Sequence, residues 1–343
     1  MHLLFTLILT FTFTASALAV SRTTLEERIP PDLFKGGNNS FLTLTLENDL
    51  FGAGTDKNYT SGVRLTYFNA AQKPGPVLHW LDDNVPMVNI NQTTSVYYSL
   101  GQNLYTPDYI TQAGPRPKER PWAGFLYGAV GMTSLIDNHV DDIELTAGVV
   151  GPAALGEPIQ KFIHRQIGAE KPEGWDNQIK NEPGLMLAWR RRWPDTFSLT
   201  TDELAFSMEP NLGATVGNIY TLAETGLTFR LTPRDDQWQD TPLHVRPSLP
   251  GSGFFRPHRN RLGWMLFAGL QGRGVLQNIF LDGNTFTDSP HAEKNHFVMD
   301  ANAGVALTYG NFRLSYTAVY RTEEFENQDN AALFGGISVG YRF

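Results

Sequence analysis

Two polar side chains, Gln160 and His164, lie four residues apart in a segment that we predict to form a short helix over residues 157–168. Pro158 suits the first helical turn and Gly168 suits the end. Residues four apart share one face of a helix, so the amide and the imidazole would lie side by side. Imidazole titrates near neutral pH and is the commonest general base. The pair therefore predicts a hydrolytic centre or, with equal weight when taken alone, an ordinary surface helix.

Two acidic residues in other predicted loops, Asp49 and Glu170, are hard oxygen ligands of the kind that Ca²⁺ prefers. Asn48 or backbone carbonyl groups could complete such a site. Taken singly, each acid is better explained as a solvated loop charge, and the hydroxyl of Thr60 at a strand end is as readily structural. The presence of both acids near His164 favours a functional site over a plain surface helix.

Composition excludes several common catalytic centres. The 343-residue chain has no cysteine, which excludes disulfide scaffolds, thiolate zinc sites and cysteine nucleophiles. It has no Gly-x-Ser-x-Gly and no His-Glu-x-x-His pattern, which argues against serine hydrolases and zinc peptidases. With 27 Lys and Arg against 35 Asp and Glu, the formal charge of −8 argues against a nucleic-acid partner.

The N-terminal segment predicts export. Residues 1–20 contain no Asp, Glu, Lys or Arg, and an apolar run over 3–13 precedes the small residues around Ala19. We expect a signal peptide over residues 1–19. A membrane anchor is the alternative, but the run is shorter than the ~20 residues of a spanning helix. The remaining residues, 20–343, contain no apolar stretch of ~18 residues, so we expect a single domain without a transmembrane helix.

Apolar and polar residues alternate with period two along many segments, as in strands with one face toward lipid. Residues 337, 339, 341 and 343 are apolar, whereas the residues between them are Ser, Gly and Arg. The segments 300–309 and 312–321 alternate in the same way. Arg313 and Asp300 fall on the polar face. A charge facing lipid costs roughly 2–4 kcal/mol, so these charges fit a wet barrel interior better than a dry sandwich core.

The alternation predicts an all-β, antiparallel transmembrane barrel with a short helix in an outward loop. We count twelve strands, near residues 41–48, 60–70, 94–103, 123–134, 141–151, 183–193, 202–216, 220–231, 262–273, 297–309, 312–322 and 333–343. With both termini periplasmic, Asp49, Thr60 and the 157–168 helix meet at the extracellular rim. The connections 71–93 and 232–261 are long for periplasmic turns and could fold against the barrel mouth.

At these residues the sequence resembles the outer-membrane lipid A 3′-O-deacylase (LpxR) family. The matching pieces cover roughly the first half of the chain after residue 19. They are Glu47-Asn48-Asp49, Asn58-Tyr59-Thr60-Ser61-Gly62, Gln102-Asn103-Leu104-Tyr105-Thr106-Pro107, and the stretch from Gly148 through Gln160, His164 and Glu170 to Asn181. The resemblance implies a twelve-stranded barrel, the number that the alternation gives independently.

The resemblance also implies an activity, Ca²⁺-dependent hydrolysis that removes the 3′-acyloxyacyl chain from lipid A. His164 would be the general base that activates water, without a covalent enzyme intermediate. Asp49 and Glu170 would hold the metal that polarises the ester carbonyl. The other implied site residues are Asn48, Thr60 and Gln160. The family's lysine in the second outward loop has no secure counterpart, because residues 108–112 contain none and Lys118 comes later.

Two alternatives remain open from the sequence. A phospholipase-type esterase could use the same centre on glycerophospholipid. A non-enzymatic pore or structural barrel is the rival from another class, although twelve strands enclose a narrow lumen that side chains largely fill. We expect a monomer in the bacterial outer membrane, in contact with its lipids and with lipopolysaccharide.

Overall fold

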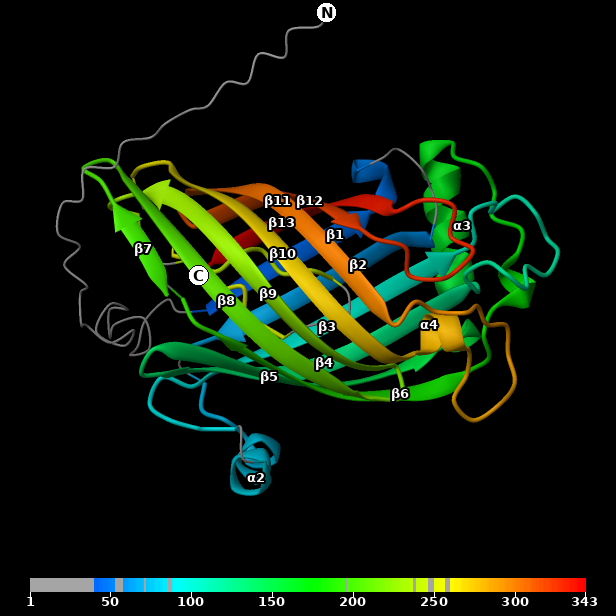
Figure 1. Ribbon diagram of the computed structural model, residues 1–343, viewed down its shortest axis with the longest axis horizontal. Coiled ribbons are helices and arrows are strands. Elements are labelled where there is room, and N and C mark those ends of the chain that lie inside the picture. The colour runs from blue at the N-terminus through cyan, green and yellow to red at the C-terminus, as the bar shows by residue number, and fades with distance from the viewer. Residues whose placement is uncertain are drawn as a thin grey trace, which may run out of the picture.

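The computed structural model describes residues 40–52, 58–70, 72–85, 88–194, 196–236, 239–245, 250–256 and 260–343. The predicted signal peptide lies outside the described residues. Thr60 is described in its backbone only. Most of the described chain is antiparallel strand, which forms one closed barrel (Figure 1). The fold class expected from the sequence is confirmed.

Twelve long strands of the described chain form the wall, and each pairs with its neighbour in sequence. They are β1 (Ser40–Asn48), β2 (Asn58–Asn69), β3 (Ser95–Thr106), β4 (Ala123–Ile136), β5 (His139–Val150), β6 (Glu182–Arg192), β8 (Leu204–Gly217), β9 (Tyr220–Pro233), β10 (Gly263–Asn278), β11 (Phe297–Tyr309), β12 (Phe312–Arg321) and β13 (Ala332–Arg342). Pairing of β1 with β13 completes the ring.

A thirteenth strand, β7 (Phe197–Thr200), was not predicted. Strand β6 pairs with residues 211–217 of β8, and after Pro194 strand β7 pairs with residues 205–208 of the same strand. Proline cannot donate a ladder hydrogen bond, which accounts for the break. The β10 strand also runs five residues beyond its predicted end, to Asn278.

The helices lie in the connections between strands and are not part of the barrel wall. Three are α-helical, α2 (Pro76–Asn84), α3 (Gly156–Ile167) and α4 (Ile279–Asp282), and three are 3₁₀ turns, η2 (Asp49–Phe51), η3 (Pro152–Ala154) and η4 (Trp175–Asn177). No helix of the described residues is long and apolar enough to cross a membrane. Strand β1 begins and strand β13 ends at the same end of the barrel, which is here called the terminal end. Helices α3 and α4 lie at the opposite end, which is here called the site end (Figure 1).

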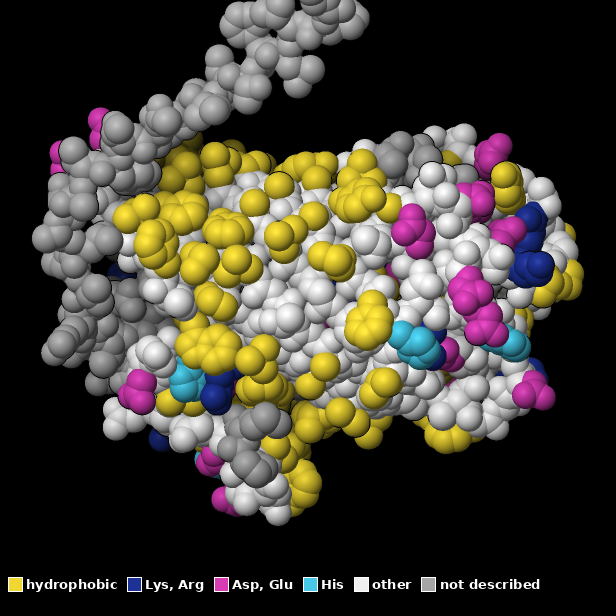
Figure 2. Space-filling view, in the orientation of Figure 1, with side chains coloured by type: hydrophobic (Ala, Val, Ile, Leu, Met, Phe, Trp, Pro, Cys, Tyr) yellow, Lys and Arg dark blue, Asp and Glu magenta, His cyan; other side chains and the backbone are white. Residues whose placement is uncertain are grey.

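Side chains alternate between the outside and the lumen as predicted. On β1, Leu44 and Leu46 are exposed outward, whereas Thr45 and Glu47 are buried inside. Hydrophobic side chains gather over the middle of the barrel wall, and charged ones concentrate toward the site end (Figure 2). The period-two pattern therefore identified the two faces correctly.

The lumen is filled by paired charges and aromatic rings. Arg64 on β2 bonds Glu144 on β5 at 2.5 Å, and Arg321 Nε on β12 bonds Asp300 on β11 at 2.7 Å. Buried charges persist only when they are paired or hydrogen-bonded. Nearer the site end, Phe280 stacks on Tyr105 with ring centroids 4.1 Å apart.

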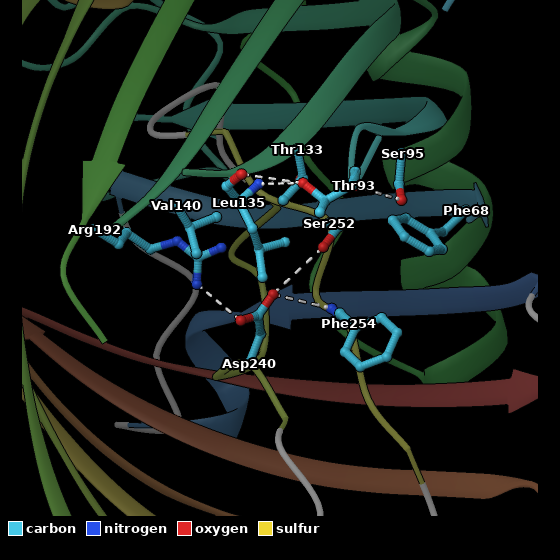
Figure 3. A pocket seen from close by; sticks show the side chains of 10 residues that line it. All are labelled: Phe68, Thr93, Ser95, Thr133, Leu135, Val140, Arg192, Asp240, Ser252 and Phe254. Atoms are coloured by element: carbon cyan, nitrogen blue, oxygen red, sulfur yellow. Dashed lines mark hydrogen bonds and ion pairs between the residues drawn. The ribbon is translucent and has the colours of Figure 1, made fainter. Parts of the chain in front are cut away.

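The connection between β9 and β10 enters the lumen, and its described residues 239–245 and 250–256 are called the plug segment. Asp240 anchors it: Arg192 Nη1 of β6 donates to Oδ1 at 2.8 Å, while Ser252 Oγ and Phe254 N donate to Oδ2 (Figure 3). Phe255 packs on Phe41 of β1 with centroids 5.2 Å apart. The expectation that this connection folds against the barrel mouth was therefore wrong, because its buried aromatic rings carry it inside.

The other long connection, between β2 and β3, takes a different course. Its helix α2 buries Leu78 and Leu81 in a cluster with Val96 of β3 and Met132 of β4. Val96 and Met132 alternate with the lumen-facing residues of their strands, so they belong to the outer wall. Figure 1 shows α2 outside the barrel.

Because the lumen is filled, we expect a barrel that does not conduct ions. Purified protein inserted into a planar lipid bilayer should show no single-channel conductance, because Arg64–Glu144 and the plug segment occupy the interior. A variant in which residues 239–256 are replaced by a two-residue turn is the matched control and should conduct. Steady conductance of the wild-type protein would contradict this arrangement.

Asp240 predicts an acid-sensitive barrel. Burial alone would raise the pKa of the Asp240 carboxyl, but Arg192, Arg230 and Arg313 outweigh that effect and hold the pKa below its ordinary value. Because the unfolded pKa is about 3.9, the stabilisation is complete above that pH and is lost as the pH falls through the lower folded value. The melting temperature should therefore fall more steeply below about pH 4 for wild type than for Asp240→Asn; parallel curves would contradict the assignment.

Candidate active site

The end of β1 forms one side of the site. Asn48 Oδ1 accepts a hydrogen bond from Leu50 N at 2.7 Å and so caps η2. The turn then crosses β13, where a Cβ added to Gly335 would lie 2.7 Å from Phe51 Cβ, so glycine permits the close approach. As a result Asp49, only 3% exposed, is buried at the barrel rim.

Helix α3 forms the other side, with its polar face inward. Gln160 and His164 are buried, whereas Phe162, Ile163 and Ile167 are exposed. A helix of a soluble protein normally has the opposite polarity, because its apolar stripe packs on the core. The shared face of Gln160 and His164 is confirmed. The exposed apolar stripe needs a nonpolar neighbour outside the described chain.

The C-terminus of α3 orients the imidazole. Gly168 adopts a left-handed conformation with φ of 69° and ends the helix, as predicted. The chain then turns back, and the Glu170 carbonyl oxygen lies 2.5 Å from His164 Nδ1. Because a carbonyl oxygen only accepts, Nδ1 carries the proton and the lone pair of the neutral ring is on Nε2. Nε2 is therefore the proton-accepting nitrogen of the neutral His164 ring.

A tryptophan fixes the amide of Gln160. Trp175 Nε1, in η4, donates to Gln160 Oε1 at 2.7 Å, and the Trp175 ring lies 5.1 Å from that of Trp122. An indole N–H only donates, so the amide orientation is determined. Gln160 Nε2 is buried and has no hydrogen-bond partner among the described residues. Both N–H groups of the Gln160 amide therefore lack a partner among the described residues.

A single cavity of about 530 Å³ brings the predicted residues together. Its polar lining includes Asn48, Asp49, Gln160, His164 and Glu170. Its apolar lining includes Leu46, Leu50, Val63, Ile163 and Ile167. Because Leu46 and Val63 are exposed on the outer wall, the cavity reaches from the polar groups to the outside of the barrel. Ser61, next to Thr60, also lines it, but the Thr60 side chain is outside the described structure.

The oxygen donors around this cavity fit Ca²⁺. Asp49 and Glu170 supply carboxylates and Asn48 an amide oxygen, and the Glu170 side chain is exposed. Within the described ranges no three His, Cys, Asp or Glu side chains are close enough to form a metal site by themselves. Ca²⁺ does not require such a cluster, since carbonyl groups and water complete its shell. The same donors suit Zn²⁺ poorly, because that ion favours histidine and cysteine.

Comparison with known proteins gives the family. The model of the family described as outer membrane protein LpxR matches residues 3–343. The chain belongs to the LpxR family. Its fold is similar to that of LpxR from Salmonella typhimurium, with 20% identity and a TM-score of 0.71, over 88% of this chain and 100% of that one.

Two further solved structures match with lower TM-scores. The beta domain of the Bordetella autotransporter BrkA is 11% identical with a TM-score of 0.41, over 89% of this chain and 98% of that one. The translocator domain of NalP from Neisseria meningitidis is 10% identical with a TM-score of 0.35, over 91% of each chain. No curated protein matches the chain in sequence. The family's description places the LpxR chains in the outer membrane.

Sequence reasoning missed two features of the site. Trp175 was recognised only as part of the family pattern, although its bond to Gln160 orients the amide. His244 belongs to no sequence motif, yet its Nδ1 lies 2.9 Å from Glu47 Oε1. No signal in the sequence could have found this pair, because the path of the plug segment brings it together.

The hydrogen bond between Trp175 and Gln160 should contribute measurably to the free energy of unfolding of the protein. Trp175→Phe removes the donor and leaves a buried Gln160 oxygen without its partner, which should lower the free energy of unfolding by about 1–3 kcal/mol in a urea titration. Trp189→Phe is the matched control, since Trp189 Nε1 makes no hydrogen bond among the described residues. Equal losses in the two variants would show that ring size, not the hydrogen bond, matters.

Proposed function

We propose that the chain is a Ca²⁺-dependent outer-membrane esterase that removes the 3′-acyloxyacyl chain from lipid A. The observation that carries the proposal is the cavity, which joins a buried imidazole and two carboxylates to an exposed apolar surface on the barrel wall. A lipid ester has the same two parts, a polar scissile group and a long apolar chain. Membership of the LpxR family and the fold shared with Salmonella LpxR support the substrate class.

His164 supplies the base. Its Nδ1–H is engaged by the Glu170 carbonyl, so Nε2 takes a proton from water as the water oxygen attacks the ester carbonyl. When the tetrahedral intermediate collapses, the same proton passes to the departing sugar oxygen. The products are a free acyloxyacyl fatty acid and a lipid A hydroxyl group. No covalent bond to the protein forms.

Polar neighbours of His164 position the reactants. Gln160 Nε2 donates a hydrogen bond to the attacking water and leaves the water's own protons facing the imidazole. Asp49 and Glu170 would hold the metal, and Asn48 and Thr60 would add hydrogen bonds or further ligands. Bound Ca²⁺ would polarise the ester carbonyl and stabilise its developing negative charge.

The apolar rim accounts for access to a lipid. Phe162, Ile163 and Ile167 of α3 are exposed beside the cavity, and the lipid-facing wall continues from them through Leu46 and Val63. Burying such side chains against acyl chains contributes roughly 25 cal/mol per Å². With the site end extracellular, this surface meets the outer leaflet, where lipid A resides. We expect the barrel to act as a monomer.

Replacing the base provides the test. Purified protein is incubated with lipid A and Ca²⁺ and the lipid is analysed by mass spectrometry. His164→Ala should lower the rate of fatty-acid release by about 10²–10⁴-fold while leaving a folded barrel. The matched control is His291→Ala, because His291 is exposed at the site end and does not line the cavity. A chelator should abolish release by the wild-type protein.

The same assay separates the alternatives. Cleavage of glycerophospholipid with lipid A left intact would retain the mechanism and overturn the substrate. If neither lipid changes, the site residues are not catalytic and the chain is a structural barrel. Unaltered release in the presence of chelator would overturn the role of Ca²⁺ alone.

A further inference from the structure

The plug segment touches the strand that carries the site. His244 Nδ1 lies 2.9 Å from Glu47 Oε1, and Glu47 is the residue directly before Asn48 and Asp49. An ionised carboxylate only accepts, so the ring nitrogen donates. The plug segment starts from the terminal end, and His244 is the point where it reaches the last residues of β1.

The barrel wall leaves space for this contact. The cross-strand neighbours of Glu47 are Gly62 on β2 and Gly336 on β13. A Cβ added to Gly336 would lie 3.3 Å from Glu47 Cγ, tighter than ordinary packing. Neither residue paired directly with Glu47 has a side chain, and His244 approaches the carboxylate from the lumen.

The pair also lies between two cavities. Glu47 lines the site cavity, whereas His244 lines a second, interior cavity of about 90 Å³. Charged side chains that line the interior cavity are Arg190, Glu224, Arg273, Asp300 and Arg321. Tyr127 Oη donates to the carbonyl of Val245 at 2.7 Å, which fixes the backbone next to His244. The backbone beside His244 is thus anchored to β4.

We propose that His244 is a positioning residue for the active site. Through its hydrogen bond to Glu47 it holds the end of β1, and so fixes Asn48 and Asp49 opposite His164. The inference rests on the proposed function. Because His244 lies away from the apolar surface of α3, it affects the rate of the chemical step and not the binding of the lipid.

The test compares kcat and KM for fatty-acid release. His244→Ala should lower kcat about tenfold to a hundredfold, since small misplacements of reacting groups have effects of this size, with KM nearly unchanged. His244→Asn, whose amide nitrogen can occupy the place of Nδ1, should recover most of the rate. Ser252→Ala is the matched control, because it removes a plug contact to Asp240 and leaves Glu47 untouched.

The outcomes separate the two proposals. If wild type does not hydrolyse lipid A, the proposed function fails. If wild type is active and His244→Ala has the same kcat, the positioning role is overturned. It is also overturned if Ser252→Ala lowers kcat and melting temperature as much as His244→Ala does, because the plug segment then only stabilises the barrel.

Discussion

Complete pairing of backbone polar groups at the barrel wall is the constraint on which the rest of this structure depends. Lipid offers no hydrogen-bond partner, so a spanning sheet must close on itself. The sheet closes through the pairing of β1 with β13 and of β6 with β8. The closed sheet has an outer face toward lipid and an inner face toward the lumen, and these two environments determine which residue types each face carries. Apolar residues such as Leu44 face outward, and charged residues such as Arg64 are confined to the lumen, where each needs a partner.

The candidate site lies where these two environments meet. Helix α3 turns Gln160 and His164 toward the barrel and leaves Phe162 and Ile167 outside. This polarity would be unfavourable in water, but beside a lipid layer the same stripe is an extension of the barrel wall. An ester at the boundary between headgroup and acyl chain could therefore reach the imidazole without leaving the membrane surface. The barrel supplies a rigid wall, and α3 and η2 carry the residues of the candidate site.

A filled lumen gives the interior a structural task in place of transport. Arg192 and Asp240 fix the plug segment near the terminal end, and His244 reaches Glu47 nearer the site. These buried charges thus connect the plug segment to the barrel wall near both ends of the barrel. Such networks are stabilising only when nearly every member is satisfied. This requirement explains why the described residues of the β9–β10 connection lie inside the lumen, where Asp240 bonds Arg192 and Phe255 packs on Phe41.

The sequence by itself determined the strands and which of their side chains face outward, because a period-two pattern is local and lipid enforces it along the wall. The twelve long strands were predictable for that reason, whereas the end of the helix at Gly168 and the shared face of Gln160 and His164 followed from helix geometry. The missed strand β7 follows a break at Pro194 and is too short to show a pattern. Only the tertiary structure decided that the plug segment enters the lumen, that Trp175 orients Gln160, and that His244 meets Glu47. These contacts join residues far apart in the chain, and their partners are chosen by the shape and charge of a closed interior that no local pattern encodes.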